Sequence, residues 1–289
     1  MTGRVRGFRV SLFGVHLAVV SDSAAMAEAV DRYVMPWLPR EAVGRAAADR
    51  LVEVRSAADA DGFEILVDGA VAGTAPSPLA AIPQVQRALD EAMVRCQADV
   101  AVIHGGVVAH GGRAILMPGP THAGKSTLVA ELVRRGTPYF SDEYALIDAD
   151  GRVHPYPRPL LLRDGSGYDQ PRLATELGGT VAHEPLPVGL IVGLRYALDA
   201  SLFTEAMSQA EGVLLLLRNT PQALADQPWI LTPLERAVGD AACYAGLRGE
   251  AQATAAAILE LASSVTRGDA GRWPSRARCS TSAGSIPGP

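Results

Sequence analysis

A phosphate-binding pattern constrains the fold of this chain more than any other feature. Residues 119–126, with the sequence GPTHAGKS, match G-x-x-x-x-G-K-[ST] without a gap. This pattern binds phosphate only when it lies between a strand and a helix. Residues 113–117 have the sequence of a short buried strand, and residues 128–135 carry apolar side chains at helical spacing before a C-cap glycine, Gly136. The sequence therefore predicts a strand, a phosphate loop and a helix in that order.

The loop supplies groups that suit a bound nucleotide. Backbone N–H groups at a helix N-terminus attract phosphate, and the ammonium of Lys125 is expected to reach the terminal phosphates. The hydroxyl of Ser126 suits Mg²⁺, a hard cation that prefers oxygen ligands. His122 either has a chemical role or is a loop residue that faces solvent. The nucleotide-binding residues are predicted to be Gly119, Pro120, Thr121, His122, Ala123, Gly124, Lys125, Ser126 and Thr127.

An acidic pair follows the predicted helix and one short strand. Asp142 and Glu143 come directly after residues 139–141. In a phosphoryl-transfer site, one carboxylate can accept the proton of the attacking hydroxyl while others hold the metal. A pair that only binds Mg²⁺ and orients water satisfies the same electrostatics. The residues alone leave both uses open.

Two arginines are candidates for neutralising the transferred phosphoryl group. Arg158 and Arg163 lie in the sequence PRPLLLR, downstream of the acidic pair. An arginine there could act as a preorganised clamp on phosphate or substrate. The alternative is that both are surface arginines in a proline-rich loop, because most arginines are exposed.

The composition excludes several kinds of protein. A net charge of −5 argues against general nucleic-acid binding. No run approaches the ~20 apolar residues of a membrane-spanning helix, so we expect neither nucleic acid nor a membrane as a partner. The three cysteines, Cys96, Cys243 and Cys279, are far apart and odd in number. They predict neither a disulfide framework nor a CxxC metal site, and they favour a reducing compartment.

The N-terminus has a superficial likeness to a signal peptide, because arginines precede an apolar run that ends near residue 20. Ser11, Gly14 and His16 interrupt that run. We therefore expect a cytoplasmic protein in which two strands meet at residues 13–14. A second hairpin is predicted at Asp68-Gly69.

The 289 residues are enough for one large domain or two. Residues 1–97 are predicted to form an N-terminal α+β region, and residues 98–265 a nucleotide-binding domain. Residues 266–289 are rich in Arg, Ser, Gly and Pro, which predicts a disordered tail. Helices in the N-terminal region are expected at residues 24–33, 40–50 and 78–96.

Residues 104–143 resemble the core of HPr kinase/phosphorylase and of its kinase-related relatives. In that family a His-Gly strand precedes a hairpin that enters the phosphate loop, and a helix ending in Arg-Gly leads to an acidic pair. The same order and spacing occur here from His104 to Glu143. The resemblance implies the α/β fold shared with phosphoenolpyruvate carboxykinase, a mixed and strongly curved β-core with a phosphate loop and flanking helices. The N-terminal α+β part would be a smaller addition to it.

The resemblance also implies roles for single residues, with ATP and Mg²⁺ as cofactors. Asp142 would be the general base for the substrate hydroxyl, and Glu143 would assist it or bind the metal with Ser126. Lys125 would hold the β- and γ-phosphates, and His104 would lie beside the phosphates. From the residues alone, His104 is instead a buried histidine bonded to the backbone.

Two departures from the family narrow what it implies. The acidic pair is usually Asp-Asp, and the long glycine-rich signature of the bifunctional enzymes is not evident here, so neither phosphorylase activity nor HPr as substrate is carried over. The chain is more similar to the short relatives, some of which accompany peptide natural-product pathways. We expect a Mg-ATP-dependent kinase that phosphorylates a serine-type hydroxyl of a peptide or protein. The alternatives are a small-molecule hydroxyl kinase on the same scaffold and a nucleotide-binding regulatory protein without phosphotransfer, and the sequence leaves a homo-oligomer open.

Overall fold

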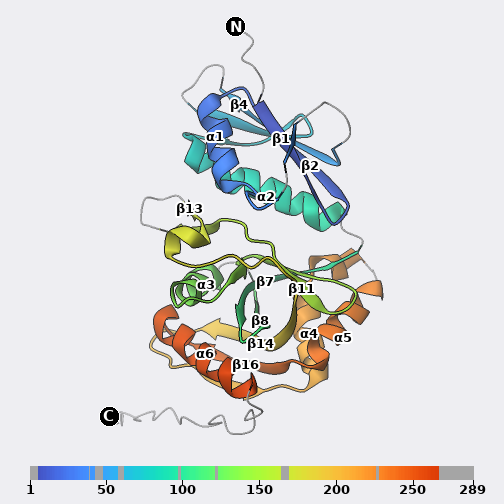
Figure 1. Ribbon diagram of the computed structural model, residues 1–289, viewed down its shortest axis with the longest axis vertical. Helices are drawn as coiled ribbons and strands as arrows, with labels where there is room; N and C mark the ends of the chain where they lie inside the picture. The colour runs from blue at the N-terminus through green and yellow to red at the C-terminus, as the bar shows by residue number, and fades with distance from the viewer. Residues whose placement is uncertain are drawn as a thin grey trace, which may run out of the picture.

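The computed structural model describes residues 6–38, 40–42, 48–57, 62–96, 99–120, 123–163, 169–225 and 228–266. It is a mixed α/β structure in which an N-terminal sheet with two helices packs on a larger C-terminal sheet with its own helices (Figure 1). The predicted disordered tail lies outside the described residues, except that residue 266 ends a helix. No helix within the described ranges is long and apolar enough to cross a membrane.

The N-terminal sheet has the strand order β3-β1-β2-β4-β5-β6. Both predicted hairpins are present, at Phe13-Gly14 and Asp68-Gly69, and all four turn residues have positive φ. Such two-residue turns match the twist of the strands they connect. The strands are β1 (Arg6–Leu12), β2 (Val15–Ser21), β3 (Glu41–Ala42), β4 (Arg50–Ser56), β5 (Phe63–Val67) and β6 (Ala70–Ala75).

The prediction of a helix at residues 40–50 is wrong for the part of this segment that the structure describes. Residues 41–42 form β3, which pairs antiparallel with β1, and Arg50 begins β4. The outer edge of β1 presents backbone N–H and C=O groups that need partners, and pairing them outweighs a weak helical preference. Residues 43–47 lie outside the described ranges.

Two helices, α1 (Ala24–Tyr33) and α2 (Pro78–Cys96), pack against this sheet where the sequence predicts them. Their apolar side chains share a core with the N-terminal strands, and this core also takes in Val102, Leu146 and Tyr156 of the C-terminal part. Helix α2 thus lies between the two parts and contacts both (Figure 1). The predicted domain boundary at residues 97–98 lies outside the described residues and stays a prediction.

The C-terminal sheet mixes parallel and antiparallel pairs in the order β11-β10-β7-β8-β14-β16-β15, with β9 paired to β7. Strand β11 also pairs with β14, so the sheet curls back on itself. It is not the all-parallel sheet of ordinary phosphate-loop NTPases. Its strands are β7 (Ala101–His110), β8 (Arg113–Pro118), β9 (Tyr139–Ser141), β10 (Tyr144–Ile147), β11 (Arg152–His154), β14 (Leu186–Tyr196), β15 (Phe203–Ala206) and β16 (Ala242–Arg248).

Helices cover this sheet on two sides. One apolar cluster joins α3 (Lys125–Arg134) and α6 (Ala251–Thr266) to the sheet, and another joins α4 (Gln209–Arg218) and α5 (Leu231–Gly239) to it (Figure 1). A separate hairpin of β12 (Leu160–Arg163) and β13 (Asp169–Arg172) contacts α2 and α3. Short 3-10 helices occur at Ala174–Leu177, Pro221–Ala225 and Pro228–Ile230.

Candidate active site

The phosphate loop connects β8 to α3, as the sequence predicts. Strand β8 ends at Pro118 and α3 begins at Lys125, after Gly124 with φ of 73° at the helix N-cap. A side chain at Gly124 would be strained by this φ and would come within 2.4 Å of the Arg248 guanidinium. Thr121 and His122 lie outside the described residues, so the two interpretations of His122 stay open.

Strand register brings the acidic pair and His104 to this loop. The Ser141 hydroxyl accepts hydrogen bonds from the N–H groups of Glu143 and Tyr144, which turns the chain between β9 and β10. In the β7–β10 pair, His104 lies opposite Tyr144.

A side chain at Gly106 would come within 2.5 Å of Val129, so this glycine lets α3 pack closely on β7.

His104, Glu143 and Lys125 form a connected polar cluster. The Nε2 atom of His104 lies 2.7 Å from Oε1 of Glu143 and 3.5 Å from Nζ of Lys125. Burial opposes the charge on Glu143, but the hydrogen bond to His104 and the nearby cations outweigh it and lower the pKa of this carboxyl. Lys125 also donates a hydrogen bond to the carbonyl of Pro120 at 2.8 Å. Burial lowers the pKa of Lys125, although the negative charges of Glu143 and Asp142 act to raise it. Among the described residues, the ring of His104 therefore contacts side chains of the predicted site, and the prediction of a histidine bonded to the backbone is not what these contacts show.

Asp142 is buried, with 1% of its surface exposed. Tyr139 donates its hydroxyl to Oδ1 of Asp142 at 3.3 Å, and the Nε atom of Arg158 lies 3.8 Å from the same oxygen. Burial raises the pKa of Asp142, whereas Arg158 and a hydrogen bond from Ser126 act in the opposite direction. Ser126, at the start of α3, therefore lies close enough to Asp142 to stabilise the charge of its carboxylate.

The two arginine candidates lie in different environments. Arg158 is buried, and its Nη1 donates to Oδ2 of Asp90 at 2.6 Å. Burial disfavours its charge, but Asp90 and Asp142 outweigh that effect and hold the pKa of Arg158 above its usual value. Arg163 has a side chain that is 79% exposed and lies 3.5 Å from Asp169. The structure therefore brings Arg158 into the site and leaves Arg163 at its edge.

An open cleft of about 750 Å³ is lined by Lys125, Ser126, Glu143 and Arg158 of the candidate site. The start of α3 contributes to its lining. Helix α2 and the strands β12 and β13 also line the cleft, so the N-terminal part contributes to the site. Its described lining residues are Pro83, Arg87, Asp90, Glu91, Gly124, Lys125, Ser126, Thr127, Ala130, Arg134, Glu143, Tyr144, Arg158, Leu161, Leu162, Arg163 and Asp169.

The oxygen atoms near the loop fit a magnesium–nucleotide complex. In the described part of the chain, no group of three or more His, Cys, Asp and Glu side chains is placed to hold a metal by itself. Mg²⁺ in nucleotide sites needs only one or two carboxylates, because phosphate and water oxygens complete its octahedron. Ser126, Asp142 and Glu143 supply hydroxyl and carboxylate oxygens of this kind beside the loop.

Two residues of the site were missed by sequence reasoning. Arg248 of β16 is buried and donates to the carbonyls of Ala123 and Gly124 at 2.8 and 3.1 Å. No local pattern marks it, because it lies far from the loop in sequence. Asp90 had a faint signal, since it lies four residues after Gln86 on an otherwise apolar helix face.

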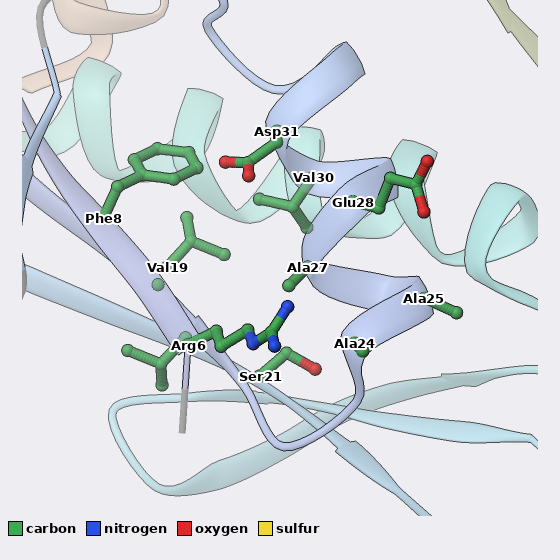
Figure 2. Close-up of a pocket in the computed structure, with 12 residues that line it drawn as sticks. Arg6, Phe8, Val19, Ser21, Ala24, Ala25, Ala27, Glu28, Val30 and Asp31 are labelled. Atoms are coloured by element: carbon green, nitrogen blue, oxygen red, sulfur yellow. The ribbon is translucent and has the colours of Figure 1, made fainter. Parts of the chain in front are cut away.

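A second hollow, of about 570 Å³, lies between α1 and strands β1 and β2 (Figure 2). Phe8, Val19 and Val30 give it apolar walls, and Glu28 and Asp31 project from α1 (Figure 2). The described residues that line it come from β1, β2 and the α1 region, and none belongs to the phosphate loop or the acidic pair. This hollow is therefore separate from the candidate nucleotide site.

Comparisons with known proteins include a distant structural likeness. No family model matches the sequence, and no curated protein matches it. Among solved structures, the Hpr(Ser) kinase/phosphatase from Coxiella burnetii is similar, with 15% sequence identity and a TM-score of 0.32. The match covers 59% of this chain and 93% of that one.

Proposed function

We propose that this protein is a Mg-ATP-dependent kinase that phosphorylates a serine-type hydroxyl of a peptide or protein on an HPr-kinase-like scaffold. The observation that carries the proposal is the contact of His104 with Glu143 at 2.7 Å and with Lys125 of the phosphate-loop helix at 3.5 Å, next to the buried carboxylate of Asp142. A carboxylate in this position can receive a proton beside the phosphates. Ser126, the residue after Lys125 in α3, also supports it, because its hydroxyl favours the charged form of Asp142 and acts to lower the pKa of this carboxyl.

Each residue has a role that its chemistry suits. Lys125 and the loop N–H groups hold the phosphates, and Ser126 and Glu143 hold Mg²⁺. When bound, ATP would supply the phosphoryl group and leave as ADP, and Mg²⁺ would neutralise charge on the phosphates. Asp142 takes the proton of the acceptor hydroxyl, and Arg158 neutralises charge on the transferred group. His104 orients Glu143 through the 2.7 Å contact between them.

The residues that line the cleft support a route for the acceptor. The nucleotide phosphates belong at the start of α3, so the acceptor hydroxyl approaches from the side of α2 and the β12–β13 hairpin. An opening between a helix and a hairpin admits an exposed peptide side chain. Its volume of about 750 Å³ also lies within the range of small-molecule pockets, which keeps a small hydroxyl acceptor as the second candidate.

The test uses the fact that Lys125 is the only lysine in the sequence. An amine-reactive acyl-phosphate analogue of ATP should modify Lys125, and Mg-ATP should protect it, as read by peptide mass spectrometry. γ-Labelled ATP is then incubated with serine-containing peptides, proteins and small hydroxyl compounds. Label that reaches a peptide hydroxyl supports the proposal, and label on small compounds alone supports the second candidate.

Lys125→Ala should remove both nucleotide protection and transfer, because the compact charge at the phosphates is lost. Arg135→Ala, at the exposed end of the same helix, is the matched control and should keep both. Tight Mg-ATP binding without transfer to any hydroxyl would favour a nucleotide-binding regulator and defeat the kinase proposal. Unchanged nucleotide affinity in Lys125→Ala would overturn the loop assignment itself.

A further inference from the structure

Asp90 is a buried carboxylate that comes from α2 of the N-terminal part. Only 3% of its surface is exposed. Oδ2 accepts a hydrogen bond from Nη1 of Arg158 at 2.6 Å. Oδ1 accepts from the hydroxyl of Tyr156 at 2.7 Å and from Nε2 of Gln86 at 2.8 Å. These bonds fix the position of the carboxylate from three directions.

Arg158 lies between two carboxylates and is bonded to only one of them. Its Nη1 contacts Asp90, whereas its Nε lies 3.8 Å from Oδ1 of Asp142, which is too far for a hydrogen bond. This Nε is buried and has no hydrogen-bond partner among the described residues. A buried donor of this kind is costly unless a ligand oxygen uses it. Arg158 is also one of the residues that line the cleft.

We propose that Asp90 is a positioning residue that holds Arg158 at the reacting end of the cleft, so that helix α2 completes the active site. This inference rests on the proposed kinase function. Without the charge of Asp90, the guanidinium is free to turn to Asp142, its other carboxylate neighbour. That contact would withdraw Arg158 from the transferred phosphoryl group.

Stability alone does not explain this arrangement. Helix α2 is already fixed by apolar side chains, since Ile82, Val85, Leu89 and Met93 are all buried in the core. A buried ion pair often contributes little net stability, because removing both charges from water costs as much as their attraction returns. The precise hydrogen bonding of Asp90 is better suited to orienting a side chain than to holding a helix.

A double-mutant cycle on phosphoryl transfer tests the inference. Asp90→Asn should lower kcat about 10-fold to 100-fold, the usual effect of losing a partner that orients a functional group, with KM for ATP nearly unchanged. Arg158→Lys should lower kcat by at least as much. If Asp90 acts through Arg158, Asp90→Asn adds little further loss in the Arg158→Lys background. Losses that multiply in the double variant would overturn the inference.

The matched control is Asp31→Asn in α1. Asp31 also pairs with an arginine, Arg40, on the N-terminal part, but its side chain is 65% exposed and remote from the cleft lining. Its kcat should be that of the wild type. Tyr156→Phe is the milder variant in case Asp90→Asn does not fold, because it removes one hydrogen bond to Asp90 and keeps the charge. It should lower kcat several-fold, and an unchanged kcat would count against the inference.

An activity-independent measurement separates this inference from the proposed function. Nitrogen-15 spectra of the arginine side chains should show a slowly exchanging Nε–H signal that disappears in Arg158→Lys. The same signal should exchange rapidly or shift in Asp90→Asn and stay unchanged in Asp31→Asn. A wild-type protein that transfers no phosphoryl group defeats the proposed function, but an unperturbed Arg158 signal in Asp90→Asn is what defeats the role of Asp90.

Discussion

Replacing Asp142 with Asn separates a general base from a metal ligand. Asn keeps the shape of the side chain and one oxygen acceptor for Tyr139 and Ser126, but it cannot take a proton. If Asp142 is the base, transfer at saturating Mg-ATP should fall by about 10²–10⁴-fold. This corresponds to roughly 3–5 kcal/mol of transition-state stabilisation, at about 1.4 kcal/mol for each factor of ten.

The structure indicates that this loss will not come from unfolding. Asp142 lies 3.8 Å from Nε of Arg158, where a charge pair gains about 4 kcal/mol at an effective dielectric constant of ~20. Burying the carboxylate costs several kcal/mol, so the two effects largely cancel. Arg158 also keeps its shorter bond to Asp90. We therefore expect the free energy of unfolding to change by less than about 2 kcal/mol, or roughly 4–8 °C in Tm.

The assay titrates Mg²⁺ at fixed ATP for the wild type, Asp142→Asn and Ser126→Ala. Asp142→Asn should keep nearly normal Mg-ATP affinity and stay inactive at every Mg²⁺ concentration. Ser126→Ala should need more Mg²⁺ and regain activity as it is added, because it loses a metal ligand. Recovery of Asp142→Asn at high Mg²⁺, or a loss of affinity in step with its activity, would refute the assignment as base and favour a metal-binding role.

Three further outcomes are expected. Arg248→Met should lower Mg-ATP affinity roughly tenfold in calorimetry, because two loop carbonyls lose a charged donor, and unchanged affinity would show that the loop holds its shape alone. Cys243 should resist iodoacetamide at pH 8 in the native protein and react after denaturation. Burial raises the pKa of this thiol to about 11, so little thiolate is present. Rapid labelling of the native protein, detected by mass spectrometry, would contradict this expectation. Residues 98–266 expressed alone should show no cooperative thermal transition by circular dichroism. Tyr156 and Leu146 would lose the N-terminal core residues that cover them. A sharp transition would show that this part folds independently.

The local parts of the site could be predicted from sequence. The phosphate loop, its strand and its helix depend on contiguous residues, and so does the turn that presents Asp142 and Glu143. The α1 and α2 helices also lie where their apolar spacing predicts them. Each of these features is set by interactions between residues close together in the chain, which the sequence displays directly.

The long-range parts could not be predicted in this way. Asp90 and Arg158 are 68 positions apart, and Arg248 meets the loop across 124 positions. Arg158 and Arg163 have similar sequence surroundings, yet one is buried and the other is 79% exposed. Only the packing of α2 against the C-terminal part decides which arginine enters the site.

The sequence by itself therefore determined where the strand, loop and helix of the candidate site lie and where the acidic pair follows, because these features are encoded in one short contiguous segment. Tertiary structure decided what surrounds those groups: the mixed, curled sheet, the strand β3 in place of a helix, and the N-terminal carboxylate that holds Arg158. The physical reason is that a buried charge needs a partner, and the chain brings that partner from any distance once the apolar surfaces have packed.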